Sequence, residues 1–115
     1  MASSFKNYGL DVDFVDGATG NMYTAGSGVQ AVVHALYISN KSETASATVN
    51  VKVTTDGGST FYHIGKSLEV PPNNTLTLDK PVNLESNDKV RIVADANPDS
   101  SSVDVEAYAS ILELT

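Results

Sequence analysis

Residues 29–58 read VQAVVHALYISNKSETASATVNVKVTTDGG, and this stretch decides the fold of the 115-residue chain. Two segments in which apolar and polar side chains alternate flank a polar patch, Asn40 to Ser46, and the second segment ends in Asp56-Gly57-Gly58. Alternation with a period of two is typical of a β-strand with one buried and one exposed face. The stretch therefore predicts a β-hairpin that is followed by a second tight turn.

The same alternation continues on both sides of this hairpin, and no segment shows a helical stripe. Turn-forming clusters separate the strands at residues 71–74 (PPNN), 85–88 (ESND) and 97–100 (NPDS). The predicted strands are Met22–Ala25, Val29–Ser39, Thr48–Thr55, Phe61–Val70, Thr75–Asp79, Lys89–Asp95 and Ser102–Leu114. Seven to eight short strands with regular turns indicate an all-β protein, an antiparallel β-sandwich of the immunoglobulin-like or jelly-roll type. Periodicity does not distinguish these two topologies.

The alternation also predicts which side chains face the core. In the strand 48–55 we expect the valines to point inward and Lys52 and Thr54 to point to solvent. His34 is in phase with Leu36 in the preceding strand, and Asp104 and Glu106 share the predicted exposed face of the last strand.

The first 19 residues form a separate segment, which precedes a β-sandwich domain at residues 20–115. Tyr8, Leu10, Val12 and Phe14 alternate with smaller or polar residues and stand before a glycine-rich break at 17–20. This segment is either an edge strand of the same domain or an extended arm that adds a strand to a neighbouring subunit. On the second alternative these four residues form the partner-binding site. Residues 1–4 are expected to be disordered.

Composition excludes several classes of function. The net charge is −7, with 14 acidic and 7 basic residues, and the lysines are scattered along the chain. A nucleic-acid-binding protein needs clustered cations, so no nucleic-acid partner is expected. No apolar run of about 18 residues is present, so no membrane span is expected. The chain has no cysteine, and therefore no disulfide or thiolate metal site.

Motifs of catalysis and cofactor binding are missing from the sequence. It contains no G-x-S-x-G nucleophile elbow and no phosphate-binding glycine loop. Its two histidines, His34 and His63, are too few for a zinc site. We therefore expect a protein that is not an enzyme and has no cofactor or metal. Tyr37 and Tyr108 lie in long predicted strands and leave open an alternative, a carbohydrate-binding β-sandwich module in which sugars stack on tyrosine rings.

Four segments carry a resemblance to a known group of proteins. They are VVHALYISN (32–40), TVNVKVTTDGG (48–58), FYHIGKSLEVPPNNTLTL (61–78) and PVNLESNDKVRIVADA (81–96), and a closing strand rich in small residues follows them at 103–111. In this order they resemble the small β-sandwich virion structural proteins of tailed bacteriophages, over roughly residues 20 to 114.

The resemblance implies a function and a place. Such proteins are similar to head decoration, or cement, proteins, which stabilise the capsid by protein–protein contacts. It implies the major capsid protein or other virion proteins as partners, and self-association into a homo-oligomer such as a trimer. It also implies a location on the capsid surface after synthesis in the bacterial host cytoplasm. A tail, neck or baseplate component of the same fold is the alternative that the resemblance leaves open.

Overall fold

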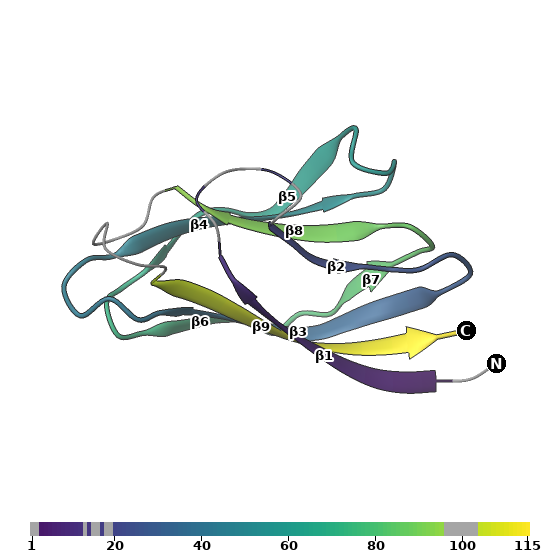
Figure 1. The fold of residues 1–115 in the computed structure, drawn as a ribbon, viewed down its shortest axis with the longest axis horizontal. Helices are drawn as coiled ribbons and strands as arrows, with labels where there is room; N and C mark the ends of the chain where they lie inside the picture. The colour runs from purple at the N-terminus through teal and green to yellow at the C-terminus, as the bar shows by residue number, and fades with distance from the viewer. Residues whose placement is uncertain (1–2, 13, 15–16, 18–19, 96–103) are drawn as a thin grey trace.

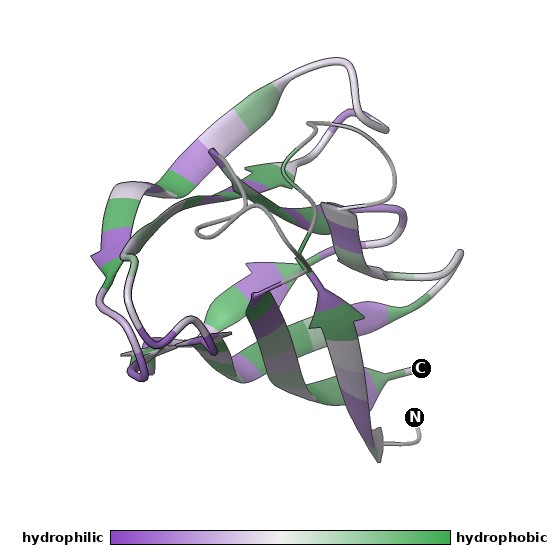
Figure 2. Ribbon diagram, turned by 60° about the vertical axis from the view of Figure 1, so that its left-hand side comes forward, coloured by the Kyte–Doolittle hydropathy of each residue, from purple (hydrophilic) through white to green (hydrophobic). Residues whose placement is uncertain are grey.

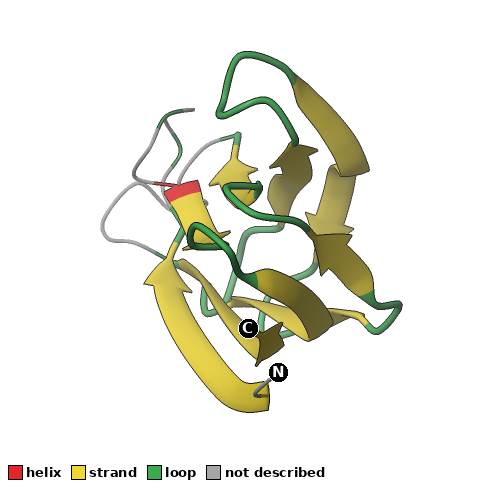
Figure 3. Cartoon of the chain, turned by 90° about the vertical axis from the view of Figure 1, so that its right-hand side faces the viewer, coloured by secondary structure: helices red, strands yellow, loops and turns green. Residues whose placement is uncertain are grey.

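Two antiparallel sheets form the protein, and they pack face to face around one core (Figure 1). The computed structural model describes residues 3–12, 14, 17, 20–95 and 104–115. Its strands are β1 (Ser3–Asp11), β2 (Asn21–Thr24), β3 (Gln30–Asn40), β4 (Ala47–Thr54), β5 (Phe61–Val70), β6 (Thr75–Leu78), β7 (Val82–Leu84), β8 (Lys89–Ala94) and β9 (Val105–Leu114). Strands account for nearly all of the regular structure (Figure 3). Among the described residues no helix is long and apolar enough to cross a membrane.

The order of the strands is that of a jelly roll. Sheet A runs β1-β9-β3-β6, with the short β7 also on β3, and sheet B runs β2-β8-β4-β5. The pairing is nested: β1 pairs with β9, β2 with β8, β3 with β6 and β7, and β4 with β5, all antiparallel. A long hairpin that has been rolled up gives this arrangement. The all-β sandwich prediction is therefore confirmed, and the connectivity is that of the jelly roll.

The core lies between the two sheets and is built from the inward-facing residues of each strand. Bands of opposite hydropathy alternate along the strands in Figure 2, as the period of two requires. Val49 and Val51 of β4 face Ile38 of β3 and Ile111 of β9 in this core, and all four are fully buried. Small residues such as Ala107 and Ala109 fill the narrow space beside them.

Two predicted exposed side chains of β4 are buried, which corrects the expectation for its outer face. Lys52 is 9% exposed because its ammonium group lies 5.4 Å from the centre of the Phe61 ring, which Arg91 also covers. Thr54 is fully buried because its hydroxyl group holds the next turn. It donates to Asp56 Oδ1 (2.8 Å) and accepts from the Gly58 amide (3.0 Å).

Asp56 fixes the predicted Asp-Gly-Gly turn. Its Oδ1 atom accepts from the amides of Thr60 (2.9 Å) and Ser59 (3.1 Å), while Gly57 and Gly58 adopt φ values of 79° and 109°. Only glycine adopts such angles readily. The hydrogen bond from the Thr60 amide, with that from Thr54, lowers the pKa of the Asp56 carboxyl. The turn is therefore most stable with Asp56 ionised.

A β-bulge in β3 changes the phase of the alternation at His34. Val33 pairs with Ile111 but Ala35 pairs with Ser110, so both His34 and Ala35 stand opposite one residue of β9. His34 is consequently exposed on the outer face with Val32, whereas Leu36 and Ile38 point inward. The expected phase of His34 with Leu36 is thus wrong, because a sequence pattern does not reveal an inserted residue.

Three other predictions need correction. Ser3 and Ser4 belong to β1, where they pair with Leu114 and Glu113, and are not disordered. Asp104 is buried, and its carbonyl accepts from the Lys41 amide (2.7 Å), so Asp104 does not share the exposed face of Glu106. The strand β7 was not predicted, because three residues are too few to show alternation. The predicted turn at 97–100 lies outside the described residues.

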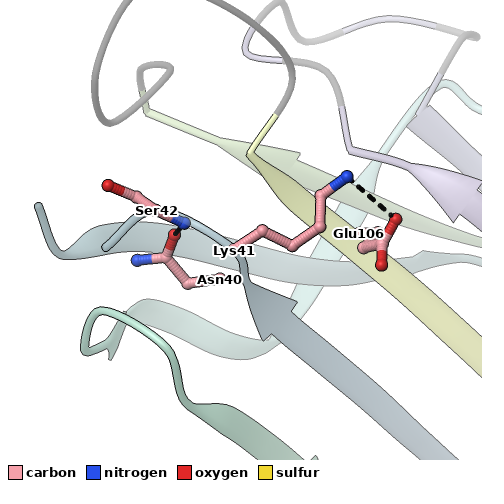
Figure 4. A network of polar contacts seen from close by, with 4 residues as sticks. All are labelled: Asn40, Lys41, Ser42 and Glu106. Atoms are coloured by element: carbon pink, nitrogen blue, oxygen red, sulfur yellow. Dashed lines mark hydrogen bonds and ion pairs between the residues drawn. The ribbon is translucent and has the colours of Figure 1, made fainter. Parts of the chain in front are cut away.

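Asn40 anchors the polar loop at 40–46 that follows β3. Its buried amide nitrogen donates to the carbonyls of Ala45 (2.8 Å) and Val70 (3.0 Å). Its Oδ1 atom accepts from the Ser42 amide (2.9 Å; Figure 4). The buried Ser42 hydroxyl accepts from the Ala45 amide (3.1 Å). One side chain thus joins the loop after β3 to the end of β5.

Candidate interaction surface

The four residues of the predicted partner-binding segment have different environments. β1 is an edge strand that pairs along its full length with β9 of its own chain. Val12, just after β1, is 3% exposed in the core, and Leu10 packs against the core from the edge. Tyr8 is 38% exposed, and Phe14 is 52% exposed where the chain crosses the outer face of sheet B. Within this chain, Leu10 and Val12 therefore serve the fold, while Tyr8 and Phe14 also present surface.

Tyr8 belongs to a small cluster that spans the two sheets. The two chain termini lie close together in Figure 1, at the end of the paired strands β1 and β9. The Tyr8 ring packs against Tyr23 of β2, with 5.3 Å between the ring centroids. The Tyr23 hydroxyl donates a hydrogen bond to the Glu113 carboxylate of β9, which links sheet B to sheet A. Burial raises the pKa of Tyr23 above its ordinary value of about 10, and the bond to Glu113 and its negative charge raise it further.

This link predicts a loss of stability in alkali. The pKa of Tyr23 is higher in the folded than in the unfolded state, so its contribution is complete below pH 10 and falls as the pH rises above that value. One proton changes the free energy of unfolding by about 1.4 kcal/mol per pH unit. Urea titrations between pH 8 and 11 should show a shallower decline for Tyr23→Phe than for the wild type. Equal slopes would show that the link does not couple folding to this proton.

The outer face of sheet A is a continuous surface that no other part of the described chain covers. The strand register aligns the outward-facing residues of its five strands in rows. We call the surface that these residues form the A face. These residues are Phe5, Asn7, Gly9 and Asp11 of β1, Glu106, Tyr108, Ser110 and Leu112 of β9, Val32, His34, Ala35, Tyr37 and Ser39 of β3, Thr75 and Thr77 of β6, and Asn83 of β7.

Aromatic side chains dominate two parts of the A face. Tyr37 and Tyr108 lie side by side on β3 and β9, with ring centroids 6.3 Å apart, and are 40% and 46% exposed. Phe5, 80% exposed, stacks beside His34. The structure thus brings together the two tyrosines that the sequence singled out, and adds Phe5, which the sequence did not indicate.

A shallow groove runs beside the tyrosine pair. It encloses about 390 Å³ and is lined by Gly9, Tyr37, Ser39 and Tyr108, with Asp11 and Glu106 at its end. Gly9 leaves this part of the groove open because it has no side chain. A Cβ atom at this position would stand in open space, 4.0 Å from the Ala107 carbonyl oxygen. Lys41 forms an ion pair with Glu106 at 3.3 Å near this end (Figure 4).

The outer face of sheet B differs in chemistry from the A face. It carries a group of basic residues on neighbouring positions of β4 and β8, namely Lys52, Lys89 and Arg91. His63 of β5 pairs with Lys52 of β4. His63 is therefore on the opposite side of the molecule from His34, so the two histidines cannot share a ligand. No group of three or more potential metal ligands occurs among the described residues.

A third exposed region lies at the open side of the sandwich between β5 and β6. Tyr62 and Ile64 of β5 are 62% and 45% exposed. Ile64 lines a hollow of about 340 Å³ with Leu78, Pro81 and Val82. The sequence did not indicate this region, because Ile64 meets Leu78, Pro81 and Val82 only when the two sheets pack together.

Comparisons with known proteins show the fold. The sequence matches no family model and no curated protein. The structure resembles a chain in the acidic stable capsid structure of Helicobacter pylori bacteriophage KHP30, with a TM-score of 0.55 and 18% identity over 99% of this chain and 89% of that chain. It is also similar to the globular domain of zebrafish complement 1qA (TM-score 0.44, 17% identity, 86% of this chain and 71% of that one). A further likeness is to Eiger TNF from S. frugiperda (TM-score 0.45, 10% identity, 96% and 85%). The chain therefore shares an all-β fold, over nearly its whole length, with a chain of a phage capsid structure.

Proposed function

We propose that the protein is a bacteriophage virion structural protein without enzymatic activity, and specifically a decoration protein that stabilises the head. The observation that carries this proposal is the shared fold with a chain of a phage capsid structure, because it covers 99% of one chain and 89% of the other. The sequence motifs that resemble phage virion proteins support the same assignment independently.

The surfaces of the molecule suit a binding protein. β1 is paired on one side only among the described strands, so the backbone N–H and C=O groups of every second residue in this nine-residue strand point to its open edge. Addition of a strand to such an edge is a common mode of protein recognition. We propose that this edge, with Tyr8 and Phe14 exposed on either side of the buried Val12, contacts the major capsid protein or another virion protein. Copies repeated over a shell would turn a weak contact into strong attachment.

Thermal release of DNA from particles tests the function. Particles that assemble without this protein should release their DNA at a lower temperature than complete particles, and addition of the purified protein should restore the difference. Phe14→Ala should restore it less well, while Tyr62→Ala, which truncates a more exposed ring on β5, should restore it fully. If both kinds of particle release DNA at the same temperature, a head-stabilising role is excluded and a tail, neck or baseplate position becomes the explanation to test.

A further inference from the structure

The A face has the composition of the centre of a protein interface. Asp11 and Glu106 are the only Asp, Glu, Lys or Arg residues among its described outward-facing strand positions, and both lie in the row at one end. The remaining rows carry tyrosine, phenylalanine, aliphatic, hydroxyl and amide side chains and one imidazole, that of His34. Interface centres are depleted of charge and enriched in tyrosine and phenylalanine. In a chain with 21 charged residues, 14 acidic and 7 basic, a sheet face almost without charge is a distinctive feature.

The other sheet supplies the comparison within the same molecule. The outer face of sheet B carries Lys52 opposite Arg91, and Lys89 two residues before Arg91 on β8. Lys89 and Arg91 are partly exposed, whereas Lys52 is buried beside the Phe61 ring. The two outer faces of the molecule thus differ in charge, although solubility favours charged side chains on both. Contact with another protein surface is a physical reason for the A face to carry few of them.

The size of the A face is sufficient for a stable contact. The strands β1, β9 and β3 have 9, 10 and 11 residues, and β6 and β7, with 4 and 3 residues, share the fourth position. Neighbouring strands lie about 4.8 Å apart and rise about 3.3 Å per residue, so the face projects an area of about 600 Å². The accessible area of a face that carries side chains exceeds its projection. A standard interface buries about 800 Å² on each partner. Contact over most of the A face therefore reaches this range.

A second copy of this chain is an occupant that the area and the low charge of the A face can accept. Each copy carries a net charge of −7, so contacts between acidic surfaces of two copies are repulsive. The A face carries few acidic side chains, and Lys41 partly compensates its acidic row through the ion pair with Glu106, so repulsion opposes association less there than at an acidic surface. We propose that the A face is the surface through which copies of this protein associate, with Tyr37 and Tyr108 on its two middle strands. This proposal rests on the homo-oligomer that the proposed function includes, and it names the surface.

Analytical ultracentrifugation of the purified protein tests the proposal without any virion. The wild type should sediment as an oligomer, and the double variant Tyr37→Ser/Tyr108→Ser should associate at least about 30-fold more weakly, since interface tyrosines are frequent hot spots. Tyr62→Ser is the matched control, because it removes a more exposed tyrosine from β5, and its association should equal that of the wild type.

A second double variant keeps both tyrosines and distinguishes a weakened interface from a misfolded protein. Asn7→Glu/Thr77→Glu places two negative charges on exposed positions of the A face and should also give a monomer, with an unchanged circular dichroism spectrum. A wild type that stays monomeric at millimolar concentration would overturn the proposal, as would an oligomer that persists in both double variants. A monomer that binds a saccharide on a glycan array through Tyr37 and Tyr108 would overturn it in favour of a sugar site. Self-association without any place in a particle would contradict only the proposed function.

Discussion

Deletion of residues 1–12 is expected to unfold the domain. β1 forms a continuous antiparallel pairing with β9 from Ser3 to Asp11, and Val12 donates its amide to the Val105 carbonyl at 2.8 Å. Val12 is buried and Leu10 packs against the core, and burial of each side chain contributes about 1.5–3 kcal/mol. With the lost backbone hydrogen bonds, the total approaches the stability of about 5–15 kcal/mol that is usual for a domain.

Urea denaturation followed by circular dichroism measures this effect. The truncated protein should lose most of its free energy of unfolding or aggregate, because β9 would become an exposed edge. Deletion of residues 1–4 is the control: Ser3 and Ser4 are exposed at the end of the strand, so this shorter truncation should cost little. A chain lacking residues 1–12 that unfolds at the wild-type urea concentration would show that the segment is an arm that the domain does not need.

Replacement of Asn40 by alanine is expected to cost about 2–4 kcal/mol. The substitution removes the donor to the carbonyls of Ala45 and Val70 and the acceptor of the Ser42 amide, all at one buried side chain. A buried polar group left without a partner costs about 1–3 kcal/mol. No water can replace the amide readily, because Asn40 is only 2% exposed.

Two further variants show whether the lost hydrogen bonds cause the decrease in the free energy of unfolding. Asn40→Asp has the same shape but replaces the donor by an oxygen atom that faces two carbonyl groups, so it should destabilise at least as much as alanine. Asn74→Ala removes an exposed amide that donates to the Pro72 carbonyl (2.7 Å) in the turn before β6, and should cost less than about 1 kcal/mol. Equal melting temperatures for Asn40→Ala and Asn74→Ala would contradict the anchoring role of Asn40.

Local pattern predicted the strands because alternation acts residue by residue. Val49, Val51 and Val53 point inward as expected, and each of the seven predicted strands corresponds to one in the structure. The turn at Asp56-Gly57-Gly58 was also predictable, since its backbone angles demand glycine. The pairing of strands that are distant in the sequence was not predictable. The nested order of a jelly roll depends on which strands pair, and the periodicity within a strand does not indicate its partner.

The candidate surface was only partly predictable for the same reason. Tyr37 and Tyr108 were notable in the sequence, but 71 residues separate them, and only the pairing of β3 with β9 places them side by side. The A face, with its two acidic residues in one row, arises from five strands together. The bulge at His34 and Ala35 turns both residues outward, and no strict alternation predicts that. Conversely, the burial of Lys52 depends on the Phe61 ring of the neighbouring strand.

Electron cryo-microscopy of purified particles is the most direct test of whether this protein is part of a virion. The particles should come from the phage that encodes the chain. We expect density for the jelly roll in many copies on the outer surface of the head, with A faces of neighbouring copies in contact and β1 directed toward the shell. Particles that contain no copy of the chain, by microscopy and by mass spectrometry of their proteins, would contradict a role in the virion.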